Sequence, residues 1–253
     1  MRIEYVRLRI RASNLYDILY PRRCPVCDRP VRPAGKLICE ECEGIPERIE
    51  GATCRKCGKM LPDGTAVYCS DCAGISHVYR QGTAVFTYRS ISGAVFRFKY
   101  SGRREYAEYF AREMAEVLMY RIKNDFRVRP DMLVPVPLHS ARMRVRGYNQ
   151  SALMAAGISA LTGIPIREDV LSRTENTVPM KNMSVSDRQN NLKNAFHACS
   201  FDVKLKTIIV IDDIYTTGAT IDACATELYR AGAAFVFFMT LAIGTQADVE
   251  KNA

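Results

Sequence analysis

Hydrophobic and polar positions change their pattern near residue 82, where apolar runs begin to alternate with segments of helical periodicity. Continuous apolar runs predict buried strands, and apolar residues that recur every three to four positions predict helices. Strands are expected at Thr83–Tyr88, Asp131–Pro137, Val170–Leu171, Thr207–Ile211 and Ala234–Ala242. Helices are expected at Arg104–Lys123, Ser151–Leu161, Asp187–Lys193 and Thr217–Ala231. Since the two types alternate, we predict an α/β fold with a mostly parallel sheet flanked by helices.

The first 80 residues are marked instead by four CxxC pairs that are separated by equal gaps of eleven residues. The pairs are Cys24/Cys27, Cys39/Cys42, Cys54/Cys57 and Cys69/Cys72. Each CxxC turns two sulfurs toward one point, and two pairs complete a tetrahedral structural zinc site. We therefore predict a small zinc-ribbon head over residues 1–80 with two Zn²⁺ ions, followed by an α/β domain over residues 81–253.

The spacing leaves the pairing of the CxxC units open. In a tandem arrangement the first two pairs bind one ion and the last two bind the other, whereas a cross-braced arrangement uses alternate pairs. Either way a site of four thiolates has no open position for a substrate, so both ions are expected to stabilise the fold. Disulfides and an iron–sulfur cluster are the alternatives to zinc.

The chain shows no sign of export or of a membrane span. The opening residues MRIEYVRLRIRASN contain no long apolar run, so they are no secretory signal. The charge-free stretches Gly147–Ile166 and Ala231–Ala247 are interrupted by polar residues or too short to cross a bilayer. We expect a cytoplasmic protein, in which thiols bind metal rather than form disulfides.

The formal charge of +9 lies entirely in the first half of the chain. Residues 1–130 carry 24 Lys/Arg and 15 Asp/Glu, and the remaining residues carry 12 of each. Eight thiolates with two Zn²⁺ would lower this surplus by four charges. What remains suits an anion or nucleic-acid surface, or simply keeps the protein in solution.

The segment Ile208–Thr220, IIVIDDIYTTGAT, carries the most specific chemistry. Its apolar strand ends in Asp212 and Asp213, at the carboxyl end where open α/β sheets bind ligands. The following Thr- and Gly-rich loop and the helix after it can offer N–H groups and hydroxyls to a phosphate. The carboxylates then suit sugar hydroxyls or a divalent cation. A Walker B strand would look similar, but the chain contains no GxxxxGK[ST].

These thirteen residues resemble the fingerprint of type I phosphoribosyltransferases, which bind phosphoribosyl pyrophosphate (PRPP). The resemblance implies that Asp212 and Asp213 hold the ribose hydroxyls in the catalytic site, and that Mg²⁺ accompanies the pyrophosphate. It also implies a loop that holds the 5′-phosphate and consists of Thr216, Thr217, Gly218, Ala219 and Thr220.

The order of motifs along the chain resembles the ComF (ComFC) family of competence proteins. Four CxxC pairs are followed by FKYSGRREYAEYFA, VPVPLHSARMRVRGYNQ, RTENTVPMKNMSVSDRQNNLKNAF and the PRPP loop, over about Leu15 to Ala242. The resemblance implies a double zinc ribbon on a type I phosphoribosyltransferase fold. It also implies a role in DNA uptake on the cytoplasmic side, with single-stranded DNA and a helicase or other uptake proteins as partners.

Two further loops follow from the resemblance. Val136, Pro137, Leu138 and His139 would lie at the pyrophosphate, and Arg142, like Arg144 and Arg146, suits a phosphate contact. The alternative for this stretch is a solvated basic turn, and a lone His beside Pro is more often a satisfied loop residue than a proton carrier.

Residues 173–187 would form the second loop, which closes over PRPP and excludes water. Its cationic candidates are Arg173, Lys181 and Arg188. Family members often have Gln where this chain has Met180, so the loop's side chains are the least transferable part of the resemblance.

Three functions stay open: Mg²⁺-dependent phosphoribosyl transfer to an unknown acceptor, single-stranded DNA binding, and sensing of PRPP by a regulator. The intact Asp212-Asp213 pair and TTGAT loop favour PRPP binding, while the zinc ribbons and the basic first half favour DNA. Aromatic and basic residues interleaved between Tyr88 and Arg104 suit stacking on bases, or else an amphipathic helix.

Overall fold

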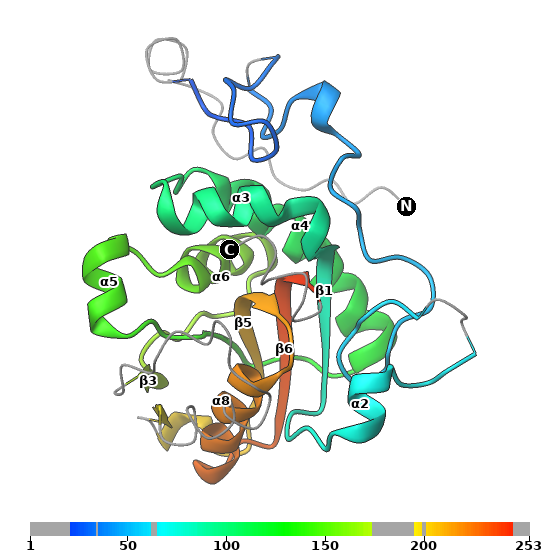
Figure 1. The fold of residues 1–253 in the computed structure, drawn as a ribbon. Coiled ribbons are helices and arrows are strands. Elements are labelled where there is room, and N and C mark those ends of the chain that lie inside the picture. Colours follow the sequence, from blue (N-terminus) through cyan, green and yellow to red (C-terminus); the bar gives the residue numbers. More distant parts are fainter. Residues whose placement is uncertain (1–20, 34, 62–64, 174–194, 199–200, 245–253) are drawn as a thin grey trace.

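The computed structural model describes residues 21–33, 35–61, 65–173, 195–198 and 201–244. A four-stranded parallel sheet with the order β1-β6-β5-β2 forms its centre (Figure 1). These strands are β1 (Gln81–Thr87), β2 (Met132–Pro135), β5 (Thr207–Tyr215) and β6 (Phe235–Ile243). A separate antiparallel pair consists of β3 (Leu171–Arg173) and β4 (Phe196–Ala198). The predicted mostly parallel α/β fold is confirmed, and the carboxyl ends of all four central strands meet at one edge.

Helices cover both faces of the central sheet. The long helices are α3 (Tyr88–Tyr100), α4 (Tyr106–Arg121), α6 (Gln150–Thr162) and α8 (Ala219–Arg230). The shorter ones are η1 (Glu40–Cys42), α2 (Ser70–Gly74), the π-helical turn η2 (Ile122–Phe126), α5 (Ser140–Arg146) and η3 (Phe201–Val203). Helices α4 and α6 cover one face, and α8 covers the other.

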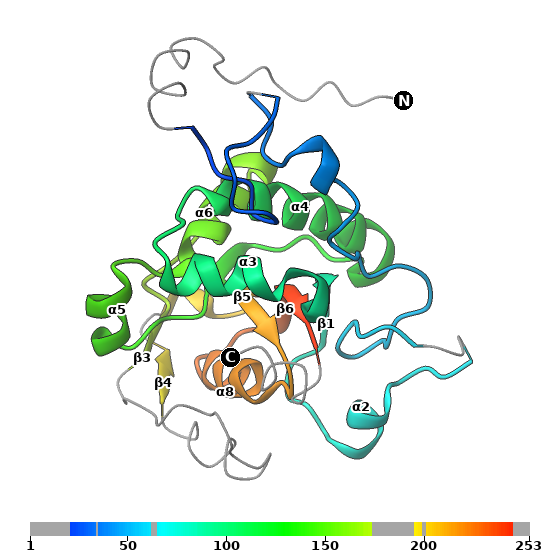
Figure 2. The ribbon, with the colours of Figure 1, turned by 45° about the horizontal axis from the view of Figure 1, so that its top comes forward.

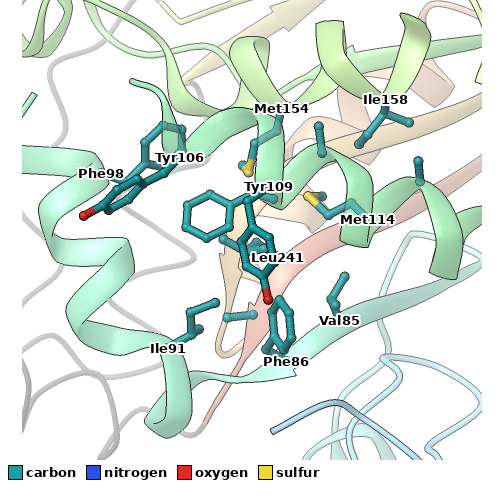
Figure 3. Packing of buried hydrophobic residues seen from close by; sticks show 14 of the residues in the cluster. Val85, Phe86, Ile91, Phe98, Tyr106, Tyr109, Met114, Met154, Ile158 and Leu241 are labelled. Carbon is teal, nitrogen blue, oxygen red and sulfur yellow. The ribbon is translucent and has the colours of Figure 1, made fainter. Parts of the chain in front are cut away.

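Alternate residues of the central strands pack on opposite faces. In β5, Ile209 and Ile211 join the core beneath α4 and α6, whereas Ile208 and Val210 join the core beneath α8. Because both faces are buried, residues 208–211 of the strand are all apolar, which is the pattern that identified it. Figure 3 shows the first of these cores, in which Tyr109 and Met114 of α4 lie near Leu241 of β6, while Tyr106 lies beside Phe98 of α3.

Most element boundaries differ from the sequence prediction by one to four residues, and the shifts in β5 and α8 bear on the site. Strand β5 extends to Tyr215, so both Asp212 and Asp213 lie within the strand. Helix α8 begins at Ala219 rather than Thr217, because Gly218 precedes it with a positive φ of 82°. Helix α3 begins at Tyr88, directly after β1. The helix predicted at residues 187–193 falls outside the described residues.

Helix α5 was not predicted, because its arginines are spread around a short helix and produce no apolar stripe. The structure supplies the reason that it forms. The Nδ1 atom of His139 accepts a hydrogen bond from Ala141 N (3.1 Å), and Gly147 ends the helix with a φ of 77°. His139 is therefore a satisfied capping residue of the kind that the sequence favoured.

The cysteine-rich segment contacts the α/β domain at two places. In Figures 1 and 2 the stretch near residues 24–42 lies over α3 and α4, while α2, near residues 69–72, lies beside β1. Among the residues that the structure describes, no helix combines the length and the apolar character needed to cross a bilayer.

Candidate ligand site and metal centres

The eight clustered cysteines form two separate four-cysteine sites. The first site consists of Cys24, Cys27, Cys39 and Cys42, and the second of Cys54, Cys57, Cys69 and Cys72. Within each site all sulfurs lie within 4.8 Å of one another, and two neighbouring Sγ atoms are 4.0 Å apart in the first and 3.7 Å in the second. Tetrahedral Zn²⁺ with Zn–S bonds of about 2.3 Å places sulfurs about 3.8 Å apart. The sites therefore fit structural zinc in the tandem pairing, and the cross-braced alternative is wrong.

One thiol in each site is prepared for metal binding by the backbone. Burial raises the pKa of Cys27, but hydrogen bonds from the Arg29 backbone and from neighbouring thiols outweigh it and lower that pKa to about 7. For Cys54, burial is likewise outweighed, chiefly by the N–H groups of Cys57 and Cys69, and the pKa is about 7. Since zinc binds the thiolate, these N–H groups stabilise the ligand form of the sulfur.

The predicted phosphate loop connects β5 to α8 at the carboxyl edge of the sheet. A small pocket is lined by residues 214–221, which include all five predicted loop residues. Gly218 is required here, since a Cβ atom at this position would lie 2.7 Å from the Tyr215 hydroxyl oxygen and 2.9 Å from Cε1 of His77. The N–H groups in the first turn of α8 lack partners within the helix, so they are available to an anion.

The two carboxylates before the loop differ in their surroundings. Asp212 Oδ1 accepts hydrogen bonds from Ser151 Oγ (3.0 Å) and Asp213 N (2.9 Å). Asp213 Oδ2 forms an ion pair with Lys99 Nζ (2.8 Å), and both side chains are mostly buried. Burial, followed by the negative charge of Asp213, raises the pKa of Asp212 to about 7. Lys99 thus offsets one of the two negative charges that would otherwise repel a phosphate.

Ser151 and Lys99 were not predicted as site residues. They come from α6 and α3, and their contacts with the carboxylates join residues that are far apart in the sequence. Lys99 lies in the FKYSGRREYAEYFA motif, which was the available signal, whereas nothing in the sequence singled out Ser151.

The predicted pyrophosphate loop lies beside the paired carboxylates. Strand β2 pairs with β5, and Val136 N donates to Ile211 O (2.9 Å), one residue before Asp212. Asn149 Nδ2 donates to Val136 O (3.0 Å) and so links the loop to the start of α6. Pro137, Leu138 and His139 follow as partly exposed residues. The structure therefore brings this loop and the β5 loop to one edge of the sheet.

Arg173 interacts electrostatically both with Arg142 and with Asp212. Burial, followed by the positive charge of Arg142, lowers the pKa of Arg173, while Asp212 acts in the opposite direction. The guanidinium of Arg173 also lies over the ring of Phe196, 5.1 Å from its centre. The Arg173 guanidinium thus adds positive charge on the side of Asp212. Lys181 and Arg188 lie outside the described residues.

A basic and aromatic surface lies where the end of α3 meets the end of α5. The guanidinium of Arg146 lies 5.1 Å from the ring centre of Tyr100, and that of Arg104 lies 4.7 Å from the ring centre of Tyr148. Tyr100 is 66% exposed, whereas Phe98 is fully buried. The interleaved stretch is therefore an amphipathic helix that keeps an exposed aromatic edge.

Known proteins match both the cysteine-rich segment and the chain as a whole. Residues 15–73 match the family model of the double zinc ribbon domain. The DNA utilization protein YhgH of Salmonella typhi is 32% identical over 220 residues, which cover 85% of this chain and 94% of that protein. Competence protein F of Haemophilus influenzae is 26% identical (83% and 92%), and competence protein ComFC of Bacillus subtilis is 28% identical (78% and 80%).

Among solved structures, a glutamine PRPP amidotransferase from B. subtilis aligns with a TM-score of 0.37 and 19% identity, over 56% of this chain and 30% of that chain. The parallel sheet flanked by helices and the two four-cysteine sites define an α/β protein with a double zinc ribbon. The chain belongs to the ComF family, as its sequence relatives over most of its length show.

Proposed function

We propose that this protein binds a ribose 5-phosphate ligand, PRPP together with Mg²⁺, and that it serves DNA uptake or utilization on the cytoplasmic side of the membrane. The observation that carries the proposal is the position of Asp212 and Asp213. They stand at the carboxyl edge of the sheet, directly before a loop that is closed by Gly218 and a helix N-terminus. A sugar phosphate needs this combination of hydroxyl acceptors and phosphate donors at neighbouring positions.

The charges around the loop suit each end of PRPP. The Asp212 and Asp213 carboxylates would accept hydrogen bonds from the ribose hydroxyls, while the N–H groups and hydroxyls of residues 216–220 would hold the 5′-phosphate. The cationic end near Arg142 and Arg173 would face the pyrophosphate. Mg²⁺ binds few protein ligands and keeps several waters, so phosphate oxygens of PRPP would supply much of its coordination.

Calorimetry of PRPP binding with Mg²⁺ tests the proposal. Wild type is expected to bind with a dissociation constant on the order of micromolar, about 8 kcal/mol. The Asp212→Asn/Asp213→Asn double variant should lose this binding. Asp131→Asn is a matched control, because Asp131 bonds to Thr207 N at the amino end of β5, away from the loop. Wild type that does not bind PRPP would overturn the proposal.

Phosphoribosyl transfer at this site would need no covalent nucleophile. The side chains would hold PRPP in place and stabilise the charge that develops as pyrophosphate leaves, with Mg²⁺ offsetting that charge. If calorimetry shows PRPP binding, release of pyrophosphate in the presence of nitrogen nucleophiles distinguishes an active transferase from a protein that only binds.

The exposed aromatic and basic surface favours single-stranded DNA as a second ligand. Tyr100 offers an exposed ring with the guanidinium of Arg146 over it, and Arg104 adds a second positive charge beside Gly147, the residue after Arg146. Bases stack on aromatic side chains without regard to sequence, and the cations contact the phosphates. The names of the relatives, which concern competence and DNA utilization, point to the same class of ligand.

Tyr100→Ala is expected to weaken binding of a labelled oligonucleotide by about tenfold, the loss of one stacked base. Tyr120→Ala is the matched control, since Tyr120 is exposed to a similar extent (62%) on α4. The affinity of wild type should fall steeply as salt rises. Equal affinities of the two variants would place the DNA elsewhere.

A further inference from the structure

The segment that leaves the second four-cysteine site runs alongside the phosphate loop before it enters β1. His77 and Tyr79 of this segment are buried, with exposed fractions of 7% and 0%. The ring of His77 stacks on that of Tyr79 with centroids 4.9 Å apart, and Tyr79 meets the ring of Tyr215 edge-on at 6.4 Å. Tyr215 is the last residue of β5, so these rings pack against the residue that begins the loop.

Hydrogen bonds from this segment reach the far side of the loop. Asp222, in the first turn of α8, lies with one carboxylate oxygen 2.7 Å from His77 Nδ1, and its other oxygen accepts from Val78 N (2.7 Å). An ionised carboxylate only accepts, so His77 Nδ1 carries the hydrogen. The Tyr215 hydroxyl lies 3.5 Å from His77 Nε2 and 2.7 Å from the Tyr79 hydroxyl. One side chain, His77, thus faces both the residue before the loop and the helix after it.

The loop backbone lies directly on the imidazole ring. A Cβ atom on Gly218 would come within 2.9 Å of Cε1 and 3.1 Å of Nδ1 of His77. Since Gly218 has a positive φ and is the residue before the first turn of α8, its position decides where the loop N–H groups point. The His77 ring therefore limits how far the backbone at Gly218 can move toward it.

The second four-cysteine site anchors this segment through the residues of its first CxxC. Lys56, between Cys54 and Cys57, donates from Nζ to the carbonyl oxygen of Tyr79 and accepts from Gly82 N (2.8 Å) through its own carbonyl. Gly58 packs so closely on β1 that a Cβ atom would lie 2.8 Å from Thr83 Cα. The Cys54/Cys57 knuckle thus contacts the segment that holds His77 and Tyr79, and this segment contacts the phosphate loop.

The first four-cysteine site contacts a different part of the domain. The guanidinium of Arg97 donates to the carbonyl oxygens of Pro25 (2.9 Å) and Val26 (2.8 Å), and Asp28 pairs with Arg103 (2.8 Å). These contacts join the first site to α3 and to the stretch before α4.

We propose that His77 is a positioning residue for the phosphate loop, and that through it the second zinc ribbon, rather than the first, sets the loop's affinity for phosphorylated ribose. The inference about affinity rests on the proposed function. The inference about loop order does not, because it concerns the protein without ligand.

Two measurements on full-length protein test this inference. Hydrogen exchange of amides in residues 216–225 reports the order of the loop, and calorimetry with ribose 5-phosphate reports affinity. His77→Ala should speed exchange and weaken affinity by about tenfold each, the effect of one hydrogen bond to a charged group. His77→Asn, which keeps a donor near the position of Nδ1, should recover part of both. Asp28→Asn, in the first ribbon, should stay within about twofold of wild type, and every variant should retain two zinc ions per chain.

Wild-type exchange in His77→Ala would overturn the inference. If His77→Ala does not fold, Asp222→Asn is tested in its place. This change keeps the shape of the side chain that bonds to His77 and removes its charge. Wild-type exchange in Asp222→Asn would also overturn the inference. If exchange rises in His77→Ala but wild type does not bind ribose 5-phosphate, the positioning role stands and the proposed function fails. If Asp28→Asn alters loop exchange as much as His77→Ala, the distinction between the two ribbons is wrong.

Discussion

The two four-cysteine sites share ligands and spacing, yet they stabilise different parts of the domain. The first packs within the core that includes α3 and α4, and its Asp28 meets Arg103 and the Tyr106 hydroxyl. The second packs within the core that includes Tyr79, Tyr215 and α8. A CxxC-x11-CxxC unit therefore specifies how a knuckle closes on zinc, while the residues beside the cysteines determine what the knuckle supports. Only the second ribbon touches the phosphate loop among the contacts of the described residues.

Loss of zinc from one site or the other should have the largest and most different effects on ribose 5-phosphate affinity. Cys57→Ser is expected to bind one ion fewer and to lose ribose 5-phosphate affinity by about a hundredfold or more, since structural zinc supplies on the order of 10 kcal/mol of folding free energy. Cys24→Ser should also lose one ion but keep affinity to within about tenfold. Elemental analysis and calorimetry measure the two effects. Equal losses of affinity would show that the ribbons act as one unit.

A Cβ atom at Gly218 should disturb the phosphate loop and leave zinc binding unchanged. Gly218→Ala is expected to destabilise the fold by about 1–3 kcal/mol and to weaken ribose 5-phosphate binding, because a left-handed φ and a clash with Tyr215 and His77 coincide there. Gly163→Ala is the matched control, since Gly163 has a φ of 73° but open space around its Cα. It should show only the conformational part of the loss in urea unfolding. A Gly218→Ala variant no weaker than Gly163→Ala would contradict the close packing on His77.

The pH dependence of the free energy of unfolding should reveal how unfavourable it is to ionise Asp212 beside Asp213. The pKa of Asp212 is about 7 in the folded protein, above its unfolded value of about 3.9, so the folded state binds more protons between these values. The contribution of Asp212 to the free energy of unfolding therefore falls as pH rises from about 4 to 7. Asp212→Asn should gain stability relative to wild type by about 1 kcal/mol or more on going from pH 5 to pH 8. A difference that does not change with pH would contradict the raised pKa.

Asp28 in the first ribbon should behave in the opposite way. Burial raises its pKa, but hydrogen bonds from Arg103 and Tyr106 outweigh this and lower it. Its contribution is then present above about pH 4 and lost as pH falls below that value. At neutral pH, Asp28→Ala is expected to cost about 1–2 kcal/mol in urea unfolding. Glu108→Gln breaks only an exposed pair with Arg22 and should change stability by less than about 0.5 kcal/mol.

Local patterns in the sequence determined the α/β class, the eight ligands and the loop after β5. In each case the determining residues are neighbours in the chain: an apolar strand buried on both faces, a CxxC knuckle, or a strand, glycine loop and helix in succession. Such features form through short-range geometry, so residue order is enough to predict them. The short helix α5 escaped prediction because its formation depends on a histidine cap and a terminal glycine rather than on an apolar stripe.

Only the tertiary structure decided which residues meet at the site. Ser151 and Asp212 are 61 positions apart, and His77 and Asp222 are 145 apart. Their contacts exist because α6 and the segment after the second four-cysteine site pack near the carboxyl edge of one sheet. The tandem pairing of the cysteines and the different partners of the two ribbons are decided in the same way. Side-chain periodicity shows that a face is buried but not what buries it, so these long-range contacts could not be predicted from the order of residues.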